Sequence, residues 1–91
     1  MCKVTIDDLI ELFGEVIDVS GIQIDAKAVL GEDIPIDSME MLRILSRIEF
    51  KYKFKFNQKE ILKIKTLGDL LEIVNHRIYV RYVRTPDVSN D

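Results

Sequence analysis

Residues 37–51 read DSMEMLRILSRIEFK, and they carry the clearest structural pattern in the chain. Its apolar residues recur at the spacing that gives a helix one apolar face; they are Met41, Leu42, Ile44, Leu45 and Ile48. Asp37 and Glu40 stand three residues apart, which is the spacing of a helix-capping pair. The sequence therefore predicts an amphipathic helix from Ser38 to about Lys51.

Upstream of this stretch, the sequence predicts a first helix followed by a long loop. Residues from Thr5 to about Ile17 carry an apolar stripe at helical spacing, and Thr5 with Asp8 suits a capping box. From Asp18 to Asp37 the pattern gives way to turn-forming residues with scattered apolar side chains. A loop of this length is unusual in a small domain and is often functional, so we expect its apolar residues to pin it across the core.

Downstream, residues 51–56 alternate lysine with aromatic residues. This alternation is typical of a strand, but the sequence offers no comparable strand to pair with it. We therefore expect an extended connector whose aromatic side chains point inward. Asn57 and Glu60 then cap a short third helix, and Thr66 begins a fourth that ends at about Tyr79.

These elements predict an all-α fold: a four-helix bundle with a long loop between the first two helices and a short third helix. The chain has 91 residues, which suits one small domain because domains usually hold about 100–150 residues. We assign residues 1–80 to this domain. Residues 81–91 turn polar around Pro86, so we expect a flexible C-terminal tail. We also expect a monomer.

The composition argues against an enzyme and against a metal centre. One Cys and one His are too few for a zinc or iron–sulfur site. His76 lies late in the fourth predicted helix, where the helix dipole favours a cation, and this suits a surface role better than catalysis. Cys2 lies near the chain end without an identifiable base beside it, so a reactive role is not expected.

The charge and hydropathy patterns narrow the range of partners. No segment approaches the roughly 18 consecutive apolar residues of a membrane span, and residues 1–8 lack a secretory signal. We therefore expect a cytoplasmic protein without membrane insertion. The lysines and aromatic residues of residues 51–65 could form a nucleic-acid-binding surface. However, their alternation places lysines and aromatic side chains on opposite faces, so both could not contact the same strand. The pI near 5.1 also argues against nucleic-acid binding.

Ser38 is the most informative candidate site. Its hydroxyl follows the predicted cap and stands in the first turn of the helix, where backbone N–H groups and the helix dipole stabilise an anion such as a phosphate ester. Position alone also suits a serine that only begins a helix, and this alternative stays open on these residues.

Asp37-Ser38-Met39 resembles the Asp-Ser-Leu signature of acyl carrier proteins and related carrier domains, with Met in place of Leu. The surrounding segments are similar to this family in order and spacing: Ile34-Pro35-Ile36, the helix from Ser38, Phe54-Lys55-Phe56, the short third helix and residues 64–70. The resemblance covers residues 4 to about 79.

The resemblance implies a carrier without catalysis of its own. By similarity, a phosphopantetheinyl transferase would attach the 4'-phosphopantetheine of coenzyme A to Ser38, and the arm would hold acyl groups as thioesters. Asp37 would cap the helix and help to present Ser38, while Met39 would anchor the turn. The partners implied are the transferase and the enzymes that load and process the acyl group.

The family also suggests a shelter for the acyl chain between the second and third helices. Seven side chains could line it, although ordinary core packing explains them at least as well: Met39, Met41, Leu42, Leu45, Phe56, Ile61 and Leu62.

One departure from the family concerns partner choice. General acyl carrier proteins present an acidic second helix, whereas this helix carries Glu40 together with Arg43 and Arg47, and Phe50 near its end. We expect these four residues to bind partners, in a specialised carrier that serves a dedicated biosynthetic pathway. The alternatives are an unmodified, carrier-like interaction domain and, less favoured by the acidic first half, an RNA-binding module.

Overall fold

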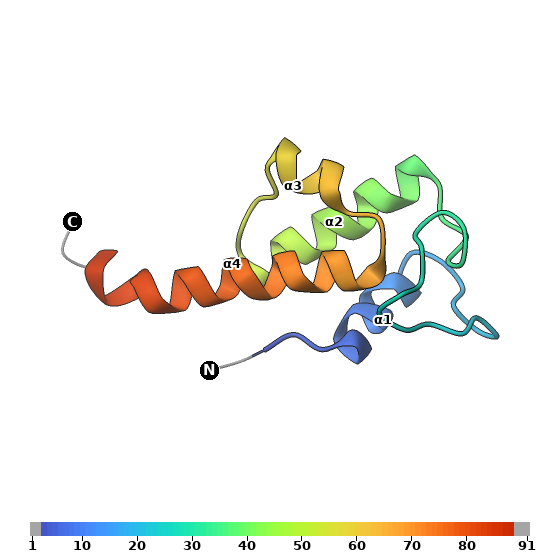
Figure 1. Ribbon diagram of the computed structural model, residues 1–91, viewed down its shortest axis with the longest axis horizontal. Helices are drawn as coiled ribbons and strands as arrows, with labels where there is room; N and C mark the ends of the chain where they lie inside the picture. Colours follow the sequence, from blue (N-terminus) through green and yellow to red (C-terminus); the bar gives the residue numbers. More distant parts are fainter. Residues whose placement is uncertain (1–2, 89–91) are drawn as a thin grey trace.

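The computed structural model describes residues 3–88, with side chains from residue 3 to residue 80, and this part of the chain forms a bundle of helices without strands (Figure 1). The helices are α1 (Ile6–Gly14), α2 (Ser38–Tyr52), α3 (Gln58–Lys63) and α4 (Leu67–Val88). α1 packs against both α2 and α4. The predicted all-α architecture, with its long loop and short third helix, is confirmed.

The predicted helix starts are confirmed because each has a reciprocal cap within one turn. In α1 the Thr5 hydroxyl accepts from the Asp8 N–H, and the Asp8 carboxylate accepts from the Thr5 N–H. α2 and α3 begin with the same arrangement, built from Asp37 with Glu40 and from Asn57 with Glu60. Each pair satisfies N–H groups that the first turn of a helix leaves without partners.

α1 is shorter than the predicted helix, which was expected to reach Ile17. It ends at Gly14, and the N–H groups of Val16 and Ile17 both donate to the Phe13 carbonyl as the chain turns away. Glycine disfavours a helix interior, which fits an end at this position. Val16 and Ile17 still pack against the core although they lie outside the helix. Their apolar side chains therefore fitted the spacing expected of a longer helix.

α4 is longer than predicted. The expected end at about Tyr79 is wrong, because the helix continues to Val88 and its C-terminal half extends beyond the other helices (Figure 1). The strongest helix breaker in this segment is Pro86, which comes only in the last turn, so nothing upstream of it removes a backbone hydrogen bond. The predicted mobility of residues 81–91 stays a prediction, and residues 89–91 lie outside the described part.

The connector between α2 and α3 confirms the extended interpretation from Phe54 onward, whereas Lys51 and Tyr52 belong to α2. Lys53 takes the left-handed conformation, with φ of 62°, and this single residue turns the chain out of the helix. Beyond it, Phe56 is buried and Phe54 packs edge-on against it, with ring centroids 4.9 Å apart. The aromatic side chains point inward, as the alternation predicted.

The core draws on α1, α2, α4 and the long loop. Its fully buried side chains are Leu9, Phe13, Ile34, Ile44, Ile48, Leu67, Leu70 and Val74. Ile34 belongs to the loop between α1 and α2, which confirms that scattered apolar residues pin this segment across the core. The loop is also tied to the start of α4, because the N–H groups of Leu67 and Gly68 donate to the carbonyls of Ala28 and Ala26.

Candidate functional site

Ser38 is the first residue of α2, and its side chain is exposed. Asp37 precedes it in an extended conformation, with φ of −96° and ψ of 179°. The Asp37 carboxylate accepts from the Glu40 N–H at 2.8 Å, and the Glu40 carboxylate accepts from the Asp37 N–H at 3.0 Å. Both bonds fix the backbone on either side of Ser38, so its hydroxyl is held at the positive end of a well-formed helix.

A cavity of about 350 Å³ lies beside this hydroxyl; we call it the Ser38 cavity. It is lined by Leu30, Ile36, Asp37, Ser38, Met41, Leu42, Leu45, Ile61 and Ile64. These residues come from the long loop, α2, α3 and the residue after α3. All are apolar except Asp37 and Ser38, so the hollow is mainly apolar and includes Ser38 in its wall. Its size is within the usual range of ligand sites.

The Ser38 cavity matches the predicted shelter only in part. Met41, Leu42, Leu45 and Ile61 line it as expected. Phe56 is instead buried in the core, Leu62 is exposed on the outer side of α3, and Met39 faces another hollow on α2.

Three lining residues were missed by the sequence reasoning: Leu30, Ile36 and Ile64. Ile64 lies three residues after Ile61, so helical spacing could have indicated it. Leu30 and Ile36 belong to the loop, where no periodicity points to a common target.

The outer side of α2 exposes several large apolar side chains among basic ones. Met39 is 65% exposed, so the prediction that it anchors the turn is wrong: its side chain faces solvent and not the core. It borders a hollow with Leu42, Arg43, Ser46 and Arg47. Phe50 is 79% exposed further along, and the Lys53 ammonium lies 4.9 Å from the centre of its ring. The predicted partner-binding residues Arg43, Arg47 and Phe50 are therefore all accessible.

The carboxylates of α2 are engaged by backbone N–H groups. Glu40 completes the cap on Asp37, and Glu49 accepts from the Phe56 N–H at 2.8 Å. Arg47 forms a solvent-exposed ion pair with Glu15, 2.9 Å long, at the end of α1. Both carboxylates of α2 thus accept hydrogen bonds from backbone N–H groups, whereas Arg43 is exposed and the Arg47 side chain is 49% exposed within its ion pair.

The other candidates from the sequence do not form a second site. His76 is exposed on α4, and Cys2 lies outside the described residues. Among residues 3–80, whose side chains are described, no three His, Cys, Asp or Glu side chains are grouped so that they could hold a metal ion. No helix within residues 3–88 has the length and apolar character needed to cross a membrane.

Comparison with known proteins agrees with this geometry. Residues 7–74 match the family described as "Phosphopantetheine attachment site". The chain is 25% identical over 72 residues to an acyl carrier protein of Cyanophora paradoxa, covering 79% of this chain and 70% of that protein. It is 21% identical over 71 residues to an acyl carrier protein of Chlamydia caviae, covering 78% and 92%. It is also 35% identical over 54 residues to the anthracycline acyl carrier protein DauA of a Streptomyces species, covering 59% and 64%.

The fold and the matched residues define a carrier protein that bears a phosphopantetheine group. The chain belongs to the acyl carrier protein family. It is a carrier and not an enzyme, and its cofactor is a covalently attached 4'-phosphopantetheine. The residues present fit this group, because an exposed hydroxyl at a helix start adjoins an apolar cavity.

Proposed function

We propose that Ser38 is the residue to which 4'-phosphopantetheine is attached, and that the Ser38 cavity shelters the acyl chain carried on it. One observation carries this proposal: the exposed Ser38 hydroxyl opens the first turn of α2 and also lines an apolar cavity of about 350 Å³. An anionic phosphodiester is stabilised at this end of the helix, while an acyl chain gains from burial among apolar side chains. Asp37 caps the helix and presents Ser38 to the transferase.

The attachment step is a phosphoryl transfer from coenzyme A. The Ser38 Oγ forms a bond to the phosphorus on the pantetheine side of the pyrophosphate, the P–O bond between the two phosphorus atoms breaks, and adenosine bisphosphate leaves. The hydroxyl proton passes to a base of the transferase. When bound, the group supplies the thiol that holds acyl groups as thioesters. The role of this chain is to expose the hydroxyl and to offer the acyl chain an apolar surface.

Intact-mass measurement after incubation with a phosphopantetheinyl transferase, magnesium and coenzyme A tests the attachment site. Wild type should gain the mass of one phosphopantetheine, and Ser38→Ala should gain none. Ser46→Ala is the matched control, because Ser46 is also exposed on α2 but lies well beyond its first turn. A modified Ser38→Ala would overturn the assignment. A wild-type protein that stays unmodified would favour an unmodified interaction domain.

We further propose a specialised carrier whose partners present acidic surfaces to α2. Arg43 and Arg47 are exposed on this helix, whereas Glu40 and Glu49 are engaged by backbone N–H groups. Complementary charges speed association, and like charges disfavour wrong partners. Phe50 and Met39 add exposed apolar contacts, which are common anchors at interfaces. The likeness to a carrier named for anthracyclines also supports a dedicated biosynthetic pathway. A cytoplasmic location and a monomeric state stay predictions.

Loading rates test the charge argument. A synthase that serves carriers with an acidic second helix should load wild type slowly and Arg43→Glu/Arg47→Glu faster. Reversal at Arg47 also sets two carboxylates against each other at Glu15, so Arg47→Gln serves as the control that loses this ion pair without reversing the charge. Equal loading rates for wild type and the double variant would remove the charge argument.

A further inference from the structure

α3 is held to the bundle mainly by polar contacts. It spans only Gln58–Lys63 and contributes no buried side chain to the core. Its two large apolar residues, Ile61 and Leu62, are both exposed, although Ile61 also lines the Ser38 cavity. Burial of apolar surface is the usual means of fixing a helix, and here it is small. The contacts that hold α3 in place must therefore come from elsewhere.

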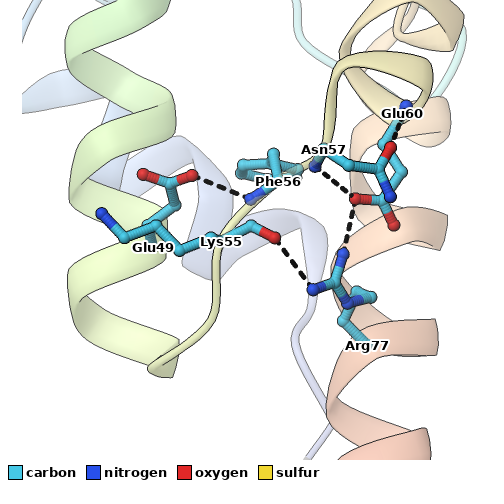
Figure 2. Close-up of polar contacts among 6 residues, drawn as sticks. All are labelled: Glu49, Lys55, Phe56, Asn57, Glu60 and Arg77. Atoms are coloured by element: carbon cyan, nitrogen blue, oxygen red, sulfur yellow. Dashed lines mark hydrogen bonds and ion pairs between the residues drawn. The ribbon is translucent and has the colours of Figure 1, made fainter.

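Arg77 of α4 contacts both α3 and the connector that precedes it (Figure 2). Its Nη1 donates to the Glu60 carboxylate at 2.6 Å, and its Nη2 donates to the Lys55 carbonyl at 2.8 Å. The guanidinium also lies 5.1 Å from the centre of the Phe54 ring. One side chain thus joins α4 to α3 and to two residues of the connector. The planar fork of arginine allows both hydrogen bonds at once.

The partner Glu60 has two roles in this network. Its carboxylate accepts from the Asn57 N–H at 3.0 Å, closing the cap of α3, and also accepts from Arg77. Partial burial acts to raise the pKa of Glu60, but the hydrogen bonds from Asn57 and Arg77 outweigh it, and the net pKa is lowered. The carboxylate therefore stays ionised and keeps a charge-assisted bond.

The Arg77–Glu60 pair is more enclosed than the other ion pair of the described residues. The side chains of Arg77 and Glu60 are 29% and 18% exposed, whereas those of Arg47 and Glu15 are 49% and 51% exposed. Solvent screens an exposed pair more strongly, so the Arg77 contact should contribute more to local stability. On the other side of the connector, Glu49 holds the Phe56 N–H, so the connector is tied to α2 as well (Figure 2).

We propose that Arg77 is the positioning residue that holds α3 against the Ser38 cavity and thereby sets how well the cavity shelters a long acyl chain. The link is direct, because Ile61 of α3 and the adjacent Ile64 line the cavity together with Met41 and Leu45 of α2. The part that concerns acyl chains rests on the proposed function of Ser38, whereas the part that concerns α3 does not.

Amide hydrogen exchange of the unmodified protein tests the first part. Arg77→Ala should raise exchange of residues 58–64 about tenfold or more, since a hydrogen bond to a charged group contributes about 1.5–3 kcal/mol. Amides in the middle of α2 should change far less. Arg77→Lys keeps the charge but not the fork, so it should restore only part of the protection. Arg47→Ala is the matched control and should leave α3 unchanged. Unchanged exchange of α3 in Arg77→Ala would overturn the proposal.

Thioester hydrolysis tests the second part. Octanoyl- and acetyl-phosphopantetheine are transferred to wild type and to Arg77→Ala from the corresponding acyl coenzyme A. The variant should hydrolyse the octanoyl thioester several-fold faster, and the acetyl thioester at the wild-type rate, because the short chain does not depend on the wall of the cavity. Equal octanoyl rates in both proteins would overturn the link between α3 and shelter. Absence of any transfer to Ser38 would refute the proposed attachment site, and the exchange result would still decide the role of Arg77.

Discussion

Gly68 lies in close contact with the long loop at the start of α4, which makes Gly68→Ala a sharp test of the fold. The Gly68 N–H donates to the Ala26 carbonyl at 2.8 Å. A Cβ added at Gly68 would lie 2.8 Å from that same oxygen and 3.3 Å from the Ala26 Cβ. The first contact is shorter than real Cβ atoms tolerate, and it involves backbone, which cannot rotate away. The loop and the helix must therefore separate.

The expected cost follows from three terms. Overpacking of this kind costs about 1–3 kcal/mol. Separation of the two segments also weakens the hydrogen bond to Ala26, worth about 1 kcal/mol. Alanine favours a helix over glycine by about 1 kcal/mol, which offsets part of the loss. Gly68→Ala should therefore lower the free energy of unfolding by about 1–3 kcal/mol.

Urea unfolding measures this change, and Gly14→Ala provides the matched control. With a slope of about 1 kcal/mol/M, as for small proteins, the midpoint of Gly68→Ala should fall by about 1–3 M. Gly14 is also a glycine within a helix. A Cβ added there would lie 3.8 Å from the Val19 side chain, which is an ordinary van der Waals contact. Gly14→Ala should therefore raise stability by about 0.5–1 kcal/mol. A Gly68→Ala midpoint equal to or above that of wild type would refute the close approach of loop and helix.

Three further predictions concern caps, acid stability and the N-terminal segment. Asp37→Ala should lower the free energy of unfolding by about 1 kcal/mol, and Asp37→Asn by less because the amide still accepts; equal losses in urea titrations would contradict the cap. Hydrogen bonds from the N–H groups of Thr66 and Lys65 lower the pKa of Asp69 from its ordinary value of 3.8. The ionised Asp69 carboxylate therefore stabilises the fold above pH 3.8, and this stabilisation is lost as the pH falls through the lowered pKa. Thermal unfolding should thus show a difference between wild type and Asp69→Asn near pH 5 that shrinks towards pH 2, and a constant difference would refute the assignment. The Asn75 side-chain oxygen accepts from the Val4 N–H at 2.8 Å, and the Asn75 side-chain NH₂ donates to the Val4 carbonyl at 3.0 Å. Asn75→Ala should therefore lower the free energy of unfolding in urea by about 2 kcal/mol. An unchanged free energy of unfolding would contradict a stabilising role for these two hydrogen bonds.

Some features of the candidate site could be predicted from the sequence and others could not. The capped start of α2 at Ser38 was predictable because Asp37 and Glu40 interact within one helical turn, and such pairs are visible as residues three positions apart. The cavity wall was predicted on α2, where periodicity defines a face, but not in the loop. Leu30 and Ile36 reach the cavity only because the loop folds back over the core. Met39 was misjudged for the same reason, since its exposure depends on where the neighbouring segments lie.

The four helices, their order, the capped start of each and the serine in the first turn of α2 can be derived from the sequence, because these features depend on contacts between residues close along the chain. The tertiary structure alone decided where α1 ends, which loop residues line the Ser38 cavity, and that Arg77 reaches Glu60 and Lys55 across the bundle. These features depend on packing between segments far apart in the sequence. The spacing of residues along the chain does not specify which distant segments come into contact.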